Sequence, residues 1–371
     1  MNSHWKKCKL GDVAVFQRGH DLPKTEMKNG NIPVAGSNGV IGYHNTATTI
    51  GPGITIGRSG NIGTPKFYKT DFWAHNTVLY VKDFKRNDEK FVYYFLNTFD
   101  FAGFNAGSAV PTLNRNHIHE IPVRIPPLPE QLAIAGVLSS LDDKIDLLHR
   151  QNKTLEGMAE ALWRKMFVEE VKTEWKVGKL GDVIKTTSGG TPSRSRQDYY
   201  ENGQYKWVKS KELQGTFIID TEEKITEEAL NNSSAKLLPK GSLLLAMYGA
   251  TVGEHGILTE EATCNQAVCA LIPNENYPYT FIHMFLKMNK EEIINHAVGS
   301  AQQNISQIVI QNFEVVQPNP AIIQFHKSVE GGFEKIKSNI FQIRTLSRLR
   351  DTLLPKLMSG EVRVRGMNRK R

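Results

Sequence analysis

The chain has 371 residues, of which 40% are hydrophobic and 23% are charged, and its formal net charge is +8. This length exceeds one ordinary hydrophobic core and predicts two domains. The charge is compatible with a polyanionic partner and equally with ordinary surface charge. Cys8, Cys264 and Cys269 are too few to form a disulfide framework and favour a reducing environment. No stretch approaches the roughly 18 apolar residues of a membrane span, so we expect a cytoplasmic protein.

The first segment of the chain is repeated in its second half. WKKCKLGDV at residues 5–13 returns as WKVGKLGDV at residues 175–183, with seven of nine positions identical. Further pairs follow in the same order: GITIGRSGNIG (53–63) with LLLAMYGATVG (243–253), HNTVLYV (75–81) with CNQAVCAL (264–271), FVYYFL (91–96) with FIHMFL (281–286), and GSA (107–109) with GSA (299–301). The offset drifts only from 170 to about 191. Collinear matches indicate a duplication, with roughly 20 extra residues in the second copy between positions 190 and 242.

Each copy opens with short apolar runs that are broken by Gly, Asn and Pro. These runs read as strands and turns, and helices are expected at 89–98 and 279–289. The sequence therefore predicts two similar α+β heads.

A long helix closes each copy. Between residues 130 and 167, behind the segment PPLPE, apolar side chains recur in steps of four and three, which is a heptad seam about 55 Å long. In this seam Asn152 is expected to fix the register. The second helix continues the pattern from Val329 to Ile343 and then shifts by one position to Leu346, Leu349 and Leu353, with Pro355 near its end. Because one such helix would expose its seam, we predict that the two helices pair as an antiparallel coiled coil.

These patterns divide the chain into five segments. We expect the first head at residues 1–126, the first spacer helix at 127–168, the second head at 169–316, the second spacer helix at 317–360 and a basic C-terminal tail at 361–371. Two unlike modules joined by stiff helices are suited to reading two half-sites of duplex DNA at a fixed spacing.

The whole plan resembles the specificity subunit of Type I restriction–modification systems. The resemblance depends on W-x4-LGDV at the start of each half, PPLPEQ before the first long helix and LLPKLMSGEVRV at the end. It implies two target recognition domains, each reading one half of a bipartite asymmetric DNA site, with the helices as a conserved spacer. It also implies two adenine-methyltransferase (modification) subunits and ATP-dependent restriction subunits as partners. S-adenosylmethionine and ATP would serve those partners, and this chain would be non-catalytic with no cofactor of its own. The second spacer begins with QPNPAIIQF rather than PPLPEQLAI, which leaves its helix start less defined.

Two other classes of protein compete with this interpretation. The first is a stand-alone DNA methyltransferase or nuclease with degenerate motifs. Against it, the sequence has no Asn/Asp-Pro-Pro-Tyr/Phe tetrad, no phosphate-binding loop in GRSGNIG and no third ligand beside His117 and His119. The second is a coiled-coil adaptor without a role in nucleic-acid binding. It explains the helices but not two divergent strand-rich heads.

Candidate DNA contacts combine a hydrogen-bond donor with a tight turn that brings the backbone close to phosphate. In the first copy these residues are Ser37, Asn38, Arg58, Ser59 and Asn61, and in the second copy they are Lys209, Lys211 and Tyr248. The same Gly-Asn and Gly-Ser pairs also mark ordinary β-turns, and a lysine on a strand edge also guards against aggregation.

Overall fold

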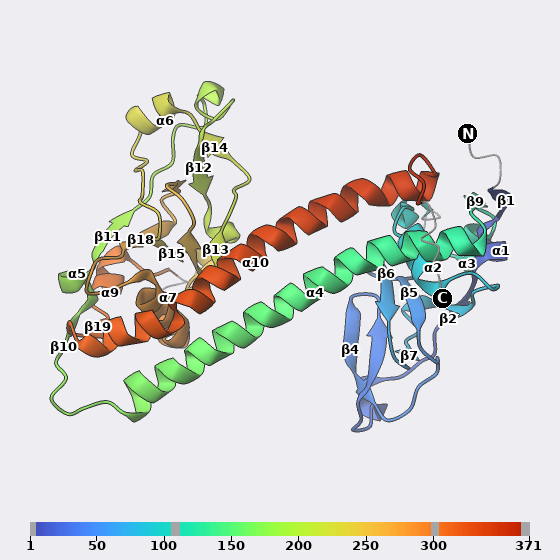
Figure 1. Ribbon diagram of the computed structural model, residues 1–371, viewed down its shortest axis with the longest axis horizontal. Helices are drawn as coiled ribbons and strands as arrows, with labels where there is room; N and C mark the ends of the chain where they lie inside the picture. The colour runs from blue at the N-terminus through green and yellow to red at the C-terminus, as the bar shows by residue number, and fades with distance from the viewer. Residues whose placement is uncertain (1–4, 105–111, 298–303, 365–371) are drawn as a thin grey trace, which may run out of the picture. The chain divides into compact units, whose positions relative to one another are not determined.

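A computed structural model of the chain describes residues 5–104, 112–297 and 304–364 (Figure 1). The chain divides into two compact units. Unit 1 consists of Met1–Ile145 and Thr345–Arg371, and unit 2 is Asp146–Arg344. Each unit contains one strand-rich head and a part of each of the two longest helices, α4 (Leu128–Arg164) and α10 (Pro320–Ser359).

Head 1 contains a four-stranded and a three-stranded sheet. The larger sheet has the antiparallel order β2-β8-β5-β6, and the smaller has the order β4-β3-β7 with β3 and β7 parallel. The elements of head 1 are β1 (Lys6–Lys9), α1 (Leu10–Val13), β2 (Val15–Arg18), η1 (Lys24–Glu26), β3 (Ile32–Gly36), β4 (Gly39–His44), β5 (Gly53–Gly57), β6 (Pro65–Tyr68), β7 (Trp73–Ala74), β8 (Val78–Asp83), α2 (Glu89–Leu96), η2 (Phe101–Phe104), α3 (Arg115–His119) and β9 (Pro122–Ile125).

Head 2 repeats this plan with one additional strand. Its larger sheet has the order β11-β18-β15-β16-β13, and its smaller sheet has the order β14-β12-β17 with β12 and β17 parallel. The elements of head 2 are β10 (Val177–Lys179), α5 (Leu180–Val183), β11 (Lys185–Ser188), η4 (Gln197–Tyr199), β12 (Tyr205–Val208), η5 (Ser210–Glu212), β13 (Phe217–Ile218), β14 (Lys224–Ile225), α6 (Glu227–Asn231), β15 (Leu243–Ala246), η6 (Gly249–Thr251), β16 (His255–Leu258), β17 (Thr263–Cys264), β18 (Val268–Ile272), α7 (Tyr279–Met288), α8 (Lys290–Asn295), α9 (Gln307–Gln311) and β19 (Glu314–Val316).

The repeated KLGDV segment makes the same local structure in both heads. Leu10 donates its N–H to Ile121 O at 2.9 Å, and Leu180 donates to Phe313 O at 2.8 Å. The glycine that follows each leucine lies against a short helix: a Cβ on Gly181 would come within 2.7 Å of Gln311 Cβ. The segment recurs because this close approach leaves no room for a side chain. Strands β1 and β10 pair with β9 and β19, so each head begins and ends in its own two-stranded ladder.

The structure locates the extra residues of the second copy. Gly19 donates its N–H to Val78 O, and Gly189 donates in the same way to Val268 O. These two equivalent glycines are 170 positions apart in the sequence. By the ends of the central strands β5 and β15, where Ile56 and Leu245 hold equivalent places, the offset is 189. Most of the insertion follows β12, inside the range 190–242 that the sequence predicts.

The structure corrects the alignment of the two copies at the turn before β8 and β18. The hydrogen bonds from Val78 N to His75 O and from Val268 N to Asn265 O make His75, not Asn76, the counterpart of Asn265. The alignment by identity was therefore one residue out at this turn, because turn geometry rather than residue type sets the equivalence. The GSA pair at 107–109 and 299–301 lies outside the described residues.

The two long helices are antiparallel in each unit. In unit 2, Asn152 contacts Asn339 and Trp163 contacts Phe325, so later residues of α4 meet earlier residues of α10. In unit 1, Asp142 pairs with Arg350, while Leu138 shares its core with Leu357. Helix α4 passes at its end into a π-helical turn, η3 (Lys165–Glu169).

The predicted one-position shift in the seam of α10 is confirmed at Leu353, which packs on the core of unit 1, and is wrong at Leu349. Leu349 is 45% exposed, whereas Leu354 and Leu357 pack on the core of unit 1. The unshifted seam position is filled by Arg350, whose guanidinium reaches Asp142 Oδ1 at 2.8 Å. An ion pair replaces an apolar contact there, which the hydrophobic pattern alone could not reveal. Pro355 lies inside α10, which continues to Ser359.

Candidate nucleic-acid interface

In head 1 a tight hairpin presents the first pair of candidate residues. Ser37 and Asn38 form the two-residue turn between β3 and β4, and Gly39 follows with φ +110°. The Ser37 N–H donates to Thr77 Oγ1 at 3.3 Å, which fixes the turn against the start of β8. Asn38 is exposed and Ser37 is half-buried. The amide of Asn38 therefore projects from a rigid support.

The second candidate loop, residues 57–63, lies beside this turn. Gly63 donates its N–H back to Gly57 O at 3.0 Å, and a Cβ on Gly57 would come within 1.8 Å of Asn61 O. A Cβ on Gly60 would be 3.6 Å from Ser37 Oγ. The structure thus brings all five candidates of head 1 together in one region.

Arg58 is held at this region without a described carboxylate partner. Its N–H donates to Thr77 O at 2.8 Å, and its Nη1 donates to Asn76 O at 3.5 Å. Partial burial, followed by the nearby Arg18 guanidinium, lowers the pKa of Arg58. A partly desolvated cation next to a second cation is stabilised when an anion such as phosphate binds.

In head 2 the two candidate lysines contact carboxylates. Lys209 Nζ is 2.7 Å from Glu223 Oε1 and 3.3 Å from Glu222 Oε2, while Lys211 Nζ is 2.6 Å from Glu222 Oε2. Lys209 is 16% exposed and Lys211 is 59% exposed. Two acidic residues therefore hold the cations that the sequence singles out.

Sequence reasoning missed the arginine beside these lysines. Arg194 lies over the rings of Tyr200 and Trp207, 4.4 Å and 4.8 Å from their centroids, and its Nη1 is 2.7 Å from Glu223 Oε2. The run TPSRSRQDYY at residues 191–200, in which arginines precede a tyrosine pair, is the signal that could have pointed to it.

Tyr248 occupies the place in head 2 that Ser59 occupies in head 1. Each residue follows a central strand and forms an antiparallel bridge, Ser59 with Thr112 and Tyr248 with Asn304. Tyr248 is 44% exposed. Its ring is accessible on the surface, as a side chain that stacks on or abuts a base would be.

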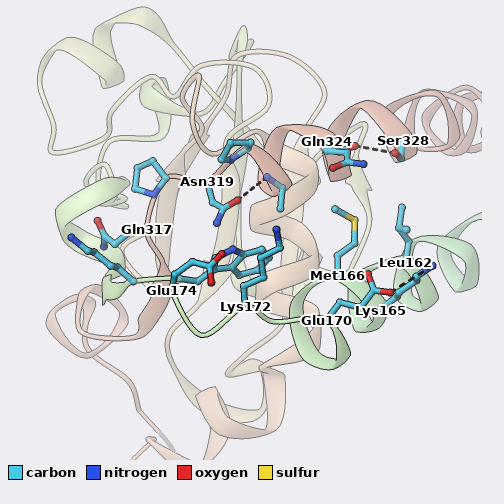
Figure 2. A pocket seen from close by; sticks show the side chains of 15 residues that line it. Leu162, Lys165, Met166, Glu170, Lys172, Glu174, Gln317, Asn319, Gln324 and Ser328 are labelled. Atoms are coloured by element: carbon cyan, nitrogen blue, oxygen red, sulfur yellow. Dashed lines mark hydrogen bonds and ion pairs between the residues drawn. The ribbon is translucent and has the colours of Figure 1, made fainter.

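A groove of about 730 Å³ lies elsewhere in unit 2, and Figure 2 shows it between the end of α4 and the start of α10. Lys172 and Glu174 line it from the segment after α4, and Gln324 lines it from α10. None of the eight candidate residues lines this groove.

Across the described ranges, no group of three or more His, Cys, Asp or Glu side chains could hold a metal ion. No described helix is long and apolar enough to cross a membrane.

Comparison with known proteins gives the family. The family model for the Type I restriction modification DNA specificity domain matches the chain twice, over residues 2–157 and 172–325. The chain belongs to this family. Each match of the specificity domain covers one head and extends into the helix that follows it. The duplication in the sequence is therefore a duplication of this domain.

The relatives of this chain are named as specificity subunits of Type I restriction enzymes. The Type I restriction enzyme MjaIX specificity subunit of Methanocaldococcus jannaschii is 29% identical over 300 residues, which are 74% of this chain and 69% of that subunit. The EcoR124I/EcoR124II specificity subunit of Escherichia coli is 29% identical over 246 residues, which are 62% of this chain and 59% of that subunit. The S subunit of a Type I restriction-modification system from M. genitalium has the same fold, with a TM-score of 0.70 at 18% identity over 96% of each chain.

Proposed function

We propose that this chain is the DNA sequence-specificity subunit of a Type I restriction–modification complex. Each head reads one half of a bipartite asymmetric site, and α4 and α10 set the gap between the halves. The observation that carries the proposal is the double match to the DNA specificity domain, one copy for each head.

The contrast between the two heads supports the reading of two different half-sites. The ladders β1/β9 and β10/β19 and the KLGDV turns are alike. The surfaces with candidate contacts differ: head 1 offers Arg58 beside Ser37 and Asn38, whereas head 2 offers lysines, arginines and aromatic rings. An arginine suits guanine and an asparagine suits adenine, while lysine and serine suit phosphate.

The assembly follows from the duplicated frame. We infer that the ladders at the start and end of each head, with the adjoining helix segments, are the docking faces for two modification subunits. Those subunits would flip one adenine in each half-site out of the stack and methylate it with S-adenosylmethionine. Restriction subunits would add an ATP-dependent nuclease. In this proposal the chain is non-catalytic, uses no cofactor of its own and acts in the cytoplasm.

Genome-wide mapping of methylated adenines tests this function. Cells with the chain and its modification subunits are expected to show methylation at one asymmetric two-part sequence with a fixed gap. Deletion of this chain alone should remove every such mark. Marks that persist without the chain, or a single undivided target sequence, would contradict the proposal.

A further inference from the structure

The insertion in head 2 carries an acidic segment that has no counterpart in the first head. In head 1, β3 leads to β4 through the two residues Ser37 and Asn38. In head 2, residues 209–223 separate β12 from β14 and include Glu212, Glu222 and Glu223.

Two of these carboxylates contact three cations. Glu222 contacts Lys211 at 2.6 Å and Lys209 at 3.3 Å, and Glu223 contacts Lys209 and Arg194, each at 2.7 Å. Hydrogen bonding to Lys211 lowers the pKa of Glu222, and hydrogen bonding to Lys209 lowers the pKa of Glu223. Both carboxylates are thus anionic at neutral pH.

The third carboxylate fixes the position of this segment. Glu212 Oε2 accepts the Lys209 N–H and its Oε1 accepts the Glu222 N–H, both at 2.7 Å. One side chain therefore joins the two ends of the insertion. This arrangement positions the anions over the cations through the backbone and not only through flexible side chains.

Arg194 and Lys209 lie over aromatic rings that are themselves held in place. The Trp207 indole is 2% exposed and donates its Nε1–H to Gly190 O at 2.9 Å, and the Tyr200 hydroxyl donates to Pro192 O at 2.6 Å. Arg194 stacks on both rings. Arginine and lysine side chains that converge on a rigid aromatic surface are well suited to a nucleic-acid backbone.

We propose that Glu222 and Glu223 are an internal counter-ion that occupies the phosphate-binding positions of head 2, so that DNA must displace them. This proposal rests on the proposed function and identifies where head 2 meets the backbone. The ion pairs of Glu222 with Lys209 and Lys211 are solvent-exposed on one or both sides, so each stabilises the closed arrangement only weakly. Phosphates of a well-docked duplex can replace the carboxylates as partners of the cations. A loosely held duplex makes fewer such contacts with the cations, so it offsets less of the loss of the ion pairs. The segment therefore weakens non-specific binding more than specific binding.

The test compares the full chain with its Glu222→Gln/Glu223→Gln variant. Each is titrated with a fluorescent 30-base-pair duplex of random sequence at several salt concentrations. The variant should bind about three- to tenfold more tightly, and its plot of log affinity against log salt should be steeper by about one to two. Adding Lys209→Met and Lys211→Met to the variant should remove the gain.

A matched control separates local displacement from net charge. The Glu275→Gln/Glu291→Gln variant removes the same charge from exposed positions in head 2, on other elements. It should bind the duplex within about twofold of the parent chain. An equal gain in this control, or a Glu222→Gln/Glu223→Gln variant that binds no better than the parent, overturns the proposal. The subunit's function stands or falls separately, on the methylation map.

Discussion

Arg58 and Lys209 show why a charge on a tight turn is ambiguous in a sequence. Both follow a strand of their head, and both were candidate contacts with DNA. Among the described residues, Arg58 has a backbone carbonyl partner and a repelling neighbour, Arg18. Lys209 has two carboxylates within 3.3 Å. Only the first is free to meet an anion without displacing another group.

The Arg58→Ala variant is expected to weaken binding at one half-site only, by about 1–3 kcal/mol if the guanidinium contacts a base. Head 2 is not altered by this change, so the other half-site should be read as before. The measurement is a titration of the complex with duplexes in which one half-site at a time is scrambled. Lys82→Ala, which removes an exposed cation from β8, is the control. Equal losses at both half-sites would instead assign Arg58 to the stability of the head.

A buried histidine pair predicts acid sensitivity of head 2. His255 Nε2 lies 3.1 Å from His283 Nδ1, and both side chains are 2% exposed. Burial lowers the pKa of His255 to about 4 and lowers that of His283 as well. Because the folded-state pKa lies below the unfolded value of 6.5, this stability is present above pH 6.5 and is lost as the pH falls towards 4.

Between pH 7 and pH 5 we expect head 2 to lose about 2 kcal/mol of unfolding free energy through His255 alone. Urea unfolding at the two pH values measures this loss. The His255→Leu/His283→Phe variant should lose distinctly less, whereas His149→Gln, which changes an exposed histidine on α4, should behave like the parent. The same loss in the double variant would mean that other groups cause the acid sensitivity.

The elements of the fold were largely predictable from the sequence, and the site was only partly so. The 3.5-residue period predicted both long helices, and FVYYFL and FIHMFL predicted α2 and α7, because apolar periodicity reports burial directly. The Gly-Ser and Gly-Asn pairs predicted the turns at Ser37 and Asn61. The partners of Lys209 were hidden because they lie 13 and 14 residues along the chain and meet it only through the fold. The seam of α10 was misjudged at Leu349 for a related reason, since the Asp142–Arg350 ion pair fills a seam position there.

At the scale of the helices, lengthening α4 and α10 by the same number of residues tests their role as a spacer. Seven residues added after Ile145 in α4 and seven added after Arg344 in α10 would lengthen the pair by about 10.5 Å. This length corresponds to about three base pairs of DNA at 3.4 Å each. The recognised gap should therefore grow by about that number, with both half-site sequences unchanged, as a methylation map would show.

An unmatched insertion is the control for this design. Adding the seven residues to α4 alone would put the Asp142–Arg350 and Asn152–Asn339 pairs out of register with each other. The buried amide pair would be lost at a cost of about 1–3 kcal/mol. We expect this variant to fail in assembly. A matched variant that changed the half-site letters and kept the gap would refute the role of the helices as a spacer.

At the scale of the whole molecule, the rival interpretation is a self-sufficient enzyme. We expect that the isolated chain neither binds S-adenosylmethionine nor transfers its methyl group to DNA, and that adding the modification subunits produces transfer. Calorimetry with S-adenosylmethionine and methyl transfer from a tritiated donor measure both points. Binding of S-adenosylmethionine by the isolated chain would revive the interpretation as a methyltransferase.

The ladders β1/β9 and β10/β19 bear on how such a chain can change through descent. The first and last strands of each head pair with each other, so the chain enters and leaves the head at neighbouring points. The segment between these strands can therefore be exchanged between lineages without displacing α4 or α10. The repeated KLGDV stretches mark the natural boundaries of such an exchange. A single crossover event could then give a population a new half-site specificity while every inherited protein contact is kept.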